Sequence, residues 1–399
     1  MMPIHLNGFG LHTALGRGVD ANLAALDRTP QPPREVPVRL ASGERGIPYY
    51  VLADTPLENL EARFEYVLHE VIAEALRRSG VSQAERRAMG FFLGSSCGEM
   101  PICEAQYRRD LALSPDALPL FQTSSLGNLA NRLRVPFGIR GPDYSFYTAC
   151  TASANALLAA ANMLRAGRLT HAIVVGVEMF NAITGLGFAG LQLVTREVMR
   201  PFDRQRNGLV PGEACAAVVL SVAPNDSPWR FEDGANLCDT HSISATNSDG
   251  SAIADVMRQA LQSCGVAASD IAAVKAHGTA SLANDEGEAA GLHRVFATMP
   301  SICALKPFIG HTFGACGAVE LALFCSAVGR GALPATPGIS PGDGDLNIAL
   351  TQQPRPQPPG KFMLNYFGFG GSNTSLVISN ETSAAPRERG TAREGASSS

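Results

Sequence analysis

Residues 147–161 read Tyr-Thr-Ala-Cys-Thr-Ala-Ser-Ala-Asn-Ala-Leu-Leu-Ala-Ala-Ala, a run of small residues that contains one cysteine. Residues 152–165 are rich in Ala and Leu and contain no Gly or Pro, which predicts a helix. Because both faces of this helix are apolar, we expect it to be buried all round. Cys150 stands at its N-terminal end, where the helix dipole favours a thiolate. From this stretch alone, Cys150 fits a nucleophile and a small core residue equally well.

The composition is that of an ordinary globular protein. The 399 residues are 45% hydrophobic and 17% charged, with a net charge of -4, which suits two lobes or one large double-layered fold. No segment reaches the ~18 uncharged apolar residues of a membrane span, and the N-terminus lacks the pattern of a secretory signal. The nine cysteines form no Cys-x-x-Cys pair and have no metal-ligand spacing with the eight histidines. We therefore expect a reduced, cytoplasmic protein without a metal site, and its mild acidity argues against nucleic-acid binding.

Predicted strands and helices alternate along both halves of the chain, which indicates an α/β fold with mainly parallel sheet. Residues 172–177 form a β-branched run typical of a strand covered on both faces. Residues 28–50 are rich in Pro and Arg and read as a surface loop. A second small-residue helix is predicted at 314–328. The halves thus look like copies, with a central helical layer between two sheets.

Three further segments carry residues that can do chemistry. They are Ala-His-Gly-Thr-Ala-Ser at 276–281, Leu-Lys-Pro-Phe-Ile-Gly-His-Thr at 305–312 and Asn-Tyr-Phe-Gly-Phe-Gly-Gly-Ser-Asn at 365–373. His277 follows a predicted strand, which is where open α/β folds bind ligands, and His311 precedes a predicted helix. Each histidine alone is more often a loop or core residue, and the glycine cluster is weak as a nucleotide loop. One cysteine and two histidines at element ends together favour nucleophilic catalysis.

In order and spacing, these motifs resemble those of the β-ketoacyl-acyl-carrier-protein synthases, condensing enzymes of the thiolase-fold family, in the elongating Cys-His-His form. The resemblance covers about residues 1–380. It implies a thiolase-like five-layered αβαβα sandwich built from two duplicated halves. The N-terminal half, 1–225, would carry Cys150, and the C-terminal half, 226–380, would carry His277 and His311. Residues 381–399 have almost no large apolar side chains and are predicted to be a disordered tail.

The resemblance also implies a decarboxylative Claisen condensation, in fatty-acid or polyketide/aryl-polyene-type biosynthesis. Cys150 would take an acyl chain from acyl carrier protein as a thioester. Malonyl-carrier protein would then lose carbon dioxide, and its carbanion would attack that thioester. His277 and His311 would stabilise the enolate through Nε–H donors. The substrates are carried on phosphopantetheine, so no separate cofactor is expected.

The family's pattern assigns supporting roles by position. Lys306 would organise the hydrogen bonding and electrostatics of the site with Glu320 as its partner, and Glu288 would lie behind the catalytic residues. For both acids, a solvated helix face is an equally good interpretation. Phe369 would be the gate between the acyl and malonyl pockets, and its backbone N–H would form the oxyanion hole with that of Cys150.

Three positions are predicted to contact substrate. Thr279 and Ser281 match positions that touch the pantetheine arm. Cys97 falls where the family lets side-chain size limit the acyl pocket, so a small residue there would admit long or rigid chains.

The surface that docks the acidic carrier protein in this family is poorly matched here. Residues 57–70 hold only Arg63 against four glutamates, and residues 114–121 hold no basic residue. The remaining candidates are Arg108, Arg109, Arg204 and Arg206. This leaves an alternative, a chain-length-factor-like partner subunit of a heterodimeric ketosynthase with little activity alone. A homodimer, or a heterodimer with a second ketosynthase-like subunit, fits equally.

Thiolases and starter-unit synthases fit the motifs less well. Thiolases use a second cysteine near the C-terminus, and residues 365–373 contain none. Starter-unit synthases use a Cys-His-Asn set, whereas a second histidine, His311, stands before the last motif here.

Overall fold

The computed structural model describes residues 2–40, 42–53, 55, 60–118, 126–336 and 346–380. Its main strands form two five-stranded sheets, which join where β1 pairs antiparallel with β9. The N-terminal sheet has the spatial order β6 (Asp143–Phe146), β5 (Gly90–Gly94), β7 (His171–Glu178), β8 (Ala214–Ser221) and β1 (Ile4–Thr13). The C-terminal sheet has the order β11 (Ser301–Cys303), β10 (Ile271–Lys275), β14 (Lys361–Phe367), β15 (Ser372–Ser379) and β9 (Arg230–Cys238).

The two sheets share one topology. With the strands of each half numbered in chain order, both sheets read 3-2-4-5-1. In both halves the second strand is parallel to the third and fourth, and the fifth is antiparallel to its neighbours. The fold is therefore a duplication. The predicted division between residues 225 and 226 falls in the connection from β8 to β9 and stays a prediction.

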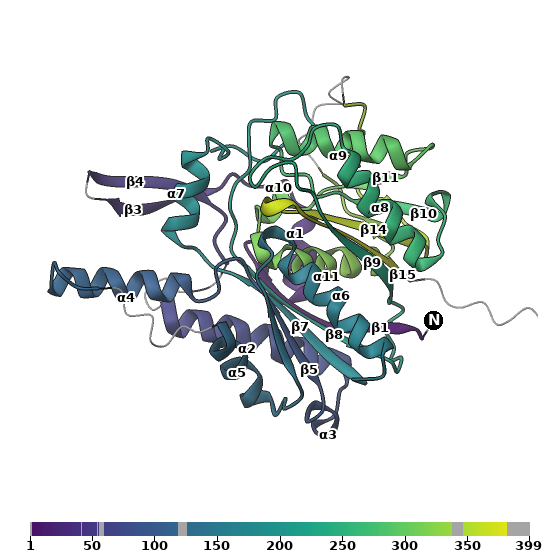
Figure 1. Cartoon of the computed structure of the whole chain (residues 1–399), viewed down its shortest axis with the longest axis horizontal. Coiled ribbons are helices and arrows are strands. Elements are labelled where there is room, and N and C mark those ends of the chain that lie inside the picture. The colour runs from purple at the N-terminus through teal and green to yellow at the C-terminus, as the bar shows by residue number, and fades with distance from the viewer. Residues whose placement is uncertain are drawn as a thin grey trace, which may run out of the picture.

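Helices fill the space between the sheets and cover their outer faces (Figure 1). Helices α6 (Ala152–Arg165) and α11 (Cys316–Gly329) pack together in the central layer. The N-terminal sheet is covered outside by α2 (Leu60–Ser79) and α5 (Leu126–Arg134), the C-terminal sheet by α8 (Ser251–Cys264) and α9 (Leu282–Val295). The order of helix, sheet, helix, sheet and helix confirms the predicted αβαβα sandwich.

Small residues explain how the central helices pack so closely. A Cβ on Gly317 would lie 2.1 Å from the backbone nitrogen of Ala154, so α11 touches α6 through main chain. A Cβ on Gly94 would likewise lie 2.4 Å from the backbone of Ser153. The predicted burial of α6 also holds, since only Asn162 on it is exposed. Close-packed interiors leave no room for larger side chains at such contacts.

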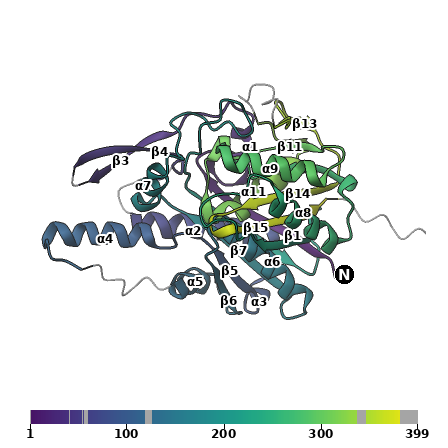
Figure 2. The ribbon, with the colours of Figure 1, turned by 45° about the horizontal axis from the view of Figure 1, so that its top comes forward.

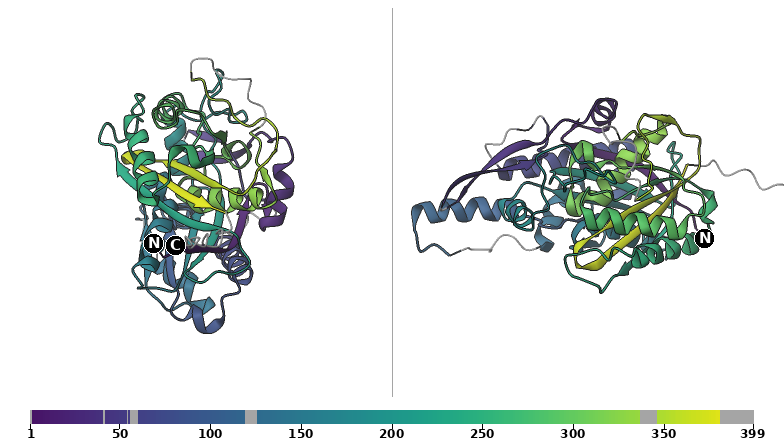
Figure 3. Two further views of the ribbon diagram at one scale, coloured as in Figure 1. Left: turned by 90° about the vertical axis from the view of Figure 1, so that its right-hand side faces the viewer. Right: turned by 90° about the horizontal axis from the view of Figure 1, so that it is seen from above.

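The prediction of a surface loop over residues 28–50 is wrong for most of its length. Strands β3 (Arg34–Leu40) and β4 (Gly43–Tyr49) form an antiparallel hairpin. Its alternating apolar residues explain this, because Val38, Ile47 and Tyr49 pack in one cluster with Ala182 of α7 (Ala182–Gly190). The hairpin projects beside α4 (Met100–Leu113), as Figures 2 and 3 show.

The predicted disordered tail, residues 381–399, lies outside the described residues. Within the described ranges, no helix combines the length and apolarity needed to cross a membrane. All nine cysteines are free thiols. Apart from single 3₁₀ turns, the other short elements of the described residues are α1 (Val19–Leu26), β2 (Gly16–Arg17), α3 (Gln83–Arg86), α10 (Lys306–Ile309), β12 (Ala332–Leu333) and β13 (Arg355–Pro356).

Candidate active site

Cys150 sits on a tight turn between β6 and α6. The chain passes through Ala149 at φ 50°, a left-handed conformation that costs a non-glycine residue free energy, and then forms the 3₁₀ turn η2 (Ala149–Thr151). Cys150 is 5% exposed and lines a cavity of about 350 Å³. His277 and His311 line the same cavity, although they lie more than a hundred residues away in sequence. The fold thus brings the three predicted catalytic side chains together.

The Cys150 thiol is less acidic than its helix position suggests. Burial raises its pKa to about 12, against the opposing effects of the Lys306 ammonium and the backbone N–H groups of Phe369 and Cys150. Desolvation therefore opposes the thiolate that the helix position was expected to favour, and the net direction of the pKa shift is upward. The two N–H groups directed at the sulfur are those predicted for the oxyanion hole.

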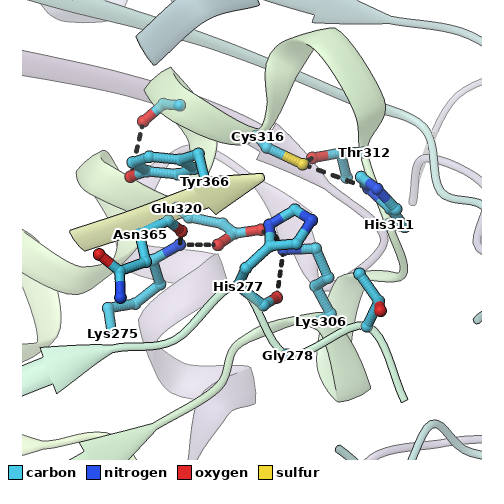
Figure 4. Close-up of polar contacts among 12 residues, drawn as sticks. Lys275, His277, Gly278, Lys306, His311, Thr312, Cys316, Glu320, Asn365 and Tyr366 are labelled. Atoms are coloured by element: carbon cyan, nitrogen blue, oxygen red, sulfur yellow. Dashed lines mark hydrogen bonds and ion pairs between the residues drawn. The ribbon is translucent and has the colours of Figure 1, made fainter. Parts of the chain in front are cut away.

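His311 is held as a neutral ring with its proton on Nε2. Its Nδ1 accepts a hydrogen bond from the backbone N–H of Phe313 (3.1 Å), and the Cys316 thiol donates to the same atom at 3.3 Å (Figure 4). A ring nitrogen that accepts cannot carry the proton, so Nε2–H is left as a donor. Burial, followed by the nearby Lys306 ammonium, lowers the pKa of His311 well below its usual value.

His277 is fixed on both its backbone and its ring. Its own N–H and that of Gly278 donate to the two oxygens of Glu288, each at 2.8 Å. Lys306 Nζ donates to the carbonyl of His277 at 2.7 Å and lies 3.3 Å from its Nδ1. Nδ1 therefore faces an ammonium, so the proton is on Nε2, as in His311. Burial and then the Lys306 charge lower the pKa of His277 well below its usual value. The two rings lie 5.4 Å apart, nearly perpendicular.

The acidic residues predicted to support the site are inside the protein. Glu320 and Glu288 are fully buried, so the interpretation as solvated helix residues is wrong for both. Glu320 Oε1 accepts from Lys306 Nζ at 2.7 Å, which is the predicted partnership. Burial raises the pKa of Glu288 to about 7, and its two backbone hydrogen bonds oppose this shift.

A second lysine, which the motif comparison missed, binds the other oxygen of Glu320. Lys275 Nζ lies 2.5 Å from Glu320 Oε2 and 2.7 Å from the carbonyl oxygen of Asn365. Burial by itself would raise the pKa of Glu320, but the two ammonium groups outweigh it and the pKa is lowered. One signal was readable beforehand, since Lys275 ends an otherwise apolar strand, Ile-Ala-Ala-Val-Lys.

A row of aromatic rings links the predicted gate to the second histidine. Phe369 stacks on Phe188 with ring centroids 5.4 Å apart, and Phe188 contacts Phe313 at 5.0 Å. Phe313 in turn stacks on His311 at 4.8 Å. Phe188, on α7, was missed by the sequence reasoning because no motif contains it.

Two of the three predicted substrate contacts lie in the cavity. Thr279 and Ser281 line it, with their hydroxyl oxygens 2.9 Å apart. Cys97 is not among the described residues that line it. Its thiol donates to Glu178 at 2.5 Å, and the backbone N–H of Gly314 donates to the same carboxylate. A role for Cys97 in the acyl pocket stays a prediction.

Two of the arginines considered for docking are buried. Arg63 forms a two-point ion pair with Glu213, at 2.9 and 2.5 Å, and its side chain is 2% exposed. Arg206 is also buried and pairs with Glu286 at 3.1 Å. The exposed candidates are Arg108, Arg109 and Arg204. Residues 119–121 of the predicted docking loop lie outside the described residues.

The fold and the site define a thiol-dependent acyltransferase of the thiolase-like class. Sequence models of one family match most of the chain: "Beta-ketoacyl synthase, N-terminal domain" over residues 60–224 and "Beta-ketoacyl synthase, C-terminal domain" over residues 232–340. Among curated relatives, 3-oxoacyl-[acyl-carrier-protein] synthase 2 of Coxiella burnetii is 29% identical and covers 78% of this chain and 80% of its own. Its counterpart in Vibrio cholerae is 28% identical, covering 76% and 79%. The chain belongs to the β-ketoacyl synthase family.

Solved structures agree on the fold. A ketosynthase in complex with its chain length factor, from Xenorhabdus doucetiae, superposes with a TM-score of 0.81 at 24% identity, covering 95% of this chain and 98% of that one. A β-ketoacyl synthase from Burkholderia phymatum gives 0.79 at 24% identity, covering 95% and 99%. With curated synthases as relatives and the Cys-His-His set in one cavity, the function is that of a β-ketoacyl synthase. The chain-length-factor alternative is not favoured.

Proposed function

We propose that this chain condenses an acyl group, held as a thioester on Cys150, with a malonyl group brought by acyl carrier protein, and that carbon dioxide is released. One observation carries the proposal: a single thiol and two neutral Nε2–H donors line one cavity. Acyl transfer needs a nucleophile, and decarboxylation needs donors for a developing negative oxygen. The cavity offers both.

Acyl transfer comes first. The Cys150 sulfur attacks the thioester carbonyl as its proton leaves, and the backbone N–H groups of Cys150 and Phe369 bind the resulting oxyanion. The carbon–sulfur bond to the carrier then breaks, the carrier's sulfur leaves as a thiolate, and this thiolate takes up the proton that Cys150 lost. The Lys306 ammonium opposes the effect of burial on the thiol, which eases the loss of this proton.

Decarboxylation and condensation follow on the same sulfur. The bond between the malonyl methylene and its carboxylate breaks, carbon dioxide leaves, and the electron pair forms a thioester enolate. His277 and His311 donate their Nε2–H groups to the enolate oxygen without giving up the protons, since both rings are neutral. The enolate carbon attacks the Cys150 thioester, and the sulfur leaves as a thiolate. The product is a β-ketoacyl chain two carbons longer, on the carrier.

The carrier arm and a second subunit complete the proposal. Thr279 and Ser281 offer hydroxyls to the amides of a pantetheine arm, and Arg204 is an exposed basic residue three positions from Asn207, which lines the cavity. Strand β6 pairs only with β5 among the described strands, so its other edge is open to a neighbour. The Xenorhabdus ketosynthase is described with a chain length factor, which supports either a second ketosynthase-like subunit or a second copy here. A cytoplasmic location accords with nine free thiols.

The test uses the purified chain alone. It is incubated with acyl- and malonyl-carrier proteins, and the products are read by mass spectrometry. We expect a β-ketoacyl-carrier product and an acyl adduct on Cys150. Malonyl-carrier protein that stays unconsumed, with no adduct on the enzyme, would reject the proposal. An adduct without condensation would point to a required partner subunit.

A further inference from the structure

Lysine is rare in this chain, and its placement is unusual. Of 32 basic Lys and Arg residues only three are lysines, Lys275, Lys306 and Lys361. Two of the three, Lys275 and Lys306, are fully buried, and both form ion pairs with the same carboxylate, that of Glu320. An ammonium is a compact charge with three donors, which a guanidinium fork cannot replace in such a space. Apart from Lys361, lysine therefore occurs in this chain only where two ammonium groups bind one carboxylate.

Lys275 has a complete set of partners. Its Nζ donates to Glu320 Oε2 at 2.5 Å and to the carbonyl oxygen of Asn365 at 2.7 Å, and it lies 3.8 Å from the centre of the Tyr366 ring (Figure 4). All these groups are buried. Lys275 also ends β10, two residues before His277, so it anchors the strand from which that histidine emerges.

Lys306 depends on this arrangement. Its Nζ has three contacts: Glu320 Oε1, the carbonyl oxygen of His277, and His277 Nδ1. Without Lys275, the second oxygen of Glu320 would be buried and unpaired, which costs free energy until another donor is found. Lys306 is the donor at hand, and turning it towards that oxygen would draw it away from Nδ1 of His277.

The cluster also carries a surplus charge. Two ammonium groups and one carboxylate give the Lys275–Glu320–Lys306 cluster itself one net positive charge, in an interior where charges are weakly screened. Glu288, which binds the backbone N–H of His277, has its pKa raised to about 7 by burial and is not part of this count. Burial is the main cause of the lowered pKa values of His277 and His311, and Lys306 and Lys275 lower them further. A Lys–Glu pair without Lys275 would be neutral overall.

We propose that Lys275 is a positioning residue for the condensation: by holding one oxygen of Glu320, it keeps Lys306 on His277, and it supplies the surplus positive charge behind the enolate site. This inference rests on the proposed function. It assigns a role to a residue outside the Cys-His-His set, which acts through Glu320 and Lys306.

The kinetic test compares K275M with K361M, a matched loss of the only lysine outside the cluster. For K275M we expect kcat for malonyl-carrier decarboxylation to fall ~10- to 100-fold, with KM nearly unchanged and with the Cys150 adduct still forming. Losing a positive charge raises the pKa of His277, so the acid limb of the rate profile should move up by about one pH unit. K361M should match wild type. A K275M enzyme with the wild-type rate and pH profile would overturn the inference.

A charge-compensated variant separates a role in the reaction from a role in folding. K275M/E320Q removes one positive and one negative charge, so its net charge equals that of wild type. We expect its acid limb to return to the wild-type pH while kcat stays low, because Lys306 has lost the carboxylate that orients it. An acid limb that stays shifted would exclude the surplus charge as the cause.

NMR spectroscopy of the wild-type protein tests the charge state of the two buried lysines without any activity measurement. Labelling only lysine Nζ with ¹⁵N yields three side-chain signals, which K275M and K361M assign. We expect Lys275 and Lys306 to give ammonium signals protected from water at neutral pH. A neutral amine at Lys275 would overturn the inference whatever the activity. If wild type does not condense at all, the proposed function fails, and these signals still report on the cluster.

Discussion

The two halves of the molecule start their central helices in the same way. In each, a non-glycine residue in the left-handed region, Ala149 at φ 50° or Phe313 at φ 40°, opens a 3₁₀ turn. A 14-residue helix of small side chains follows, α6 in one half and α11 in the other. The backbone is thus repeated, but the first turn carries the thiol of Cys150 and the second follows the imidazole of His311.

The difference between these copies is one of charge. The C-terminal half contributes both histidines and the Lys275–Glu320–Lys306 cluster, while the N-terminal half contributes a buried thiol whose pKa is raised to about 12 by burial. In the proposed reaction, one copy holds the covalent intermediate, and the other stabilises the charge that forms beside it. Neither half contains the complete set of site residues, so the candidate site lies where the two halves meet.

The largest expected effect comes from removing the contribution of the N-terminal half. Cys150→Ala should abolish the acyl adduct and lower condensation by at least ~10³-fold, because Cys150 is the only thiol among the described residues that line the cavity. Mass spectrometry of the enzyme after incubation with acyl-carrier protein reads the adduct. Cys316→Ala, which removes a thiol from the matching helix start, should keep it. An unchanged adduct on the Cys150→Ala protein would sink the assignment.

Removing one donor of the C-terminal half should affect the other step. His311→Ala should slow malonyl decarboxylation by ~10²- to 10³-fold, as expected for the loss of one preorganised donor. Adduct formation on Cys150 should persist, since the oxyanion donors Cys150 and Phe369 remain. Carbon dioxide release and the adduct are measured on the same sample. Equal loss of both would contradict the division of labour between the halves.

The pH dependence of thiol alkylation tests the electrostatics of the N-terminal half. The pKa of the Cys150 thiol is about 12, which is above the pH range of 7 to 9 used in this test. Its thiolate fraction should therefore rise about tenfold per pH unit from pH 7 to pH 9. The rate of iodoacetamide addition to the Cys150 peptide measures this, with Cys150→Ala protein as background. A rate that levels off near pH 7 would mean that the helix dipole prevails over burial.

The smallest effect concerns chain length. Cys97→Phe should shorten the longest product by filling space beside the acyl chain, with little change in the overall rate. Product lengths from malonyl-carrier extension provide the measurement, and Cys97→Ala is the matched control. An unchanged length profile would leave Cys97 as a structural partner of Glu178 only.

The sequence predicted the site residues that lie within motifs, but not those whose roles depend on tertiary packing. It placed Cys150, His277 and His311 together and paired Lys306 with Glu320. It missed Lys275, since a side chain before a motif is assigned no role until the fold turns it towards Glu320. It also took Arg63 for a surface residue, although Glu213, 150 residues away, holds it inside.

The sign of the thiol's pKa shift was missed for a related reason. A helix end can be read from the chain, but the desolvation of Cys150 depends on how tightly both halves close over it. The hairpin over residues 34–49 was missed because its Pro and Arg content outweighed its alternating apolar residues. For Lys275, Arg63 and Cys150, the deciding partner comes from elsewhere in the chain, whereas the hairpin was missed for its local composition.

The contact between Gly317 and Ala154 has a consequence for precision. Main chain rests on main chain there, and main chain has no rotamers to rearrange. The same holds where Gly314 meets the backbone of Ser96, with only 2.2 Å available to a Cβ. These main-chain contacts therefore fix the relative positions of the two backbone segments that carry the thiol and the imidazoles. Because the backbones that carry these groups rest on each other directly, we expect acyl chains of different shape to leave the spacing between those backbones unchanged.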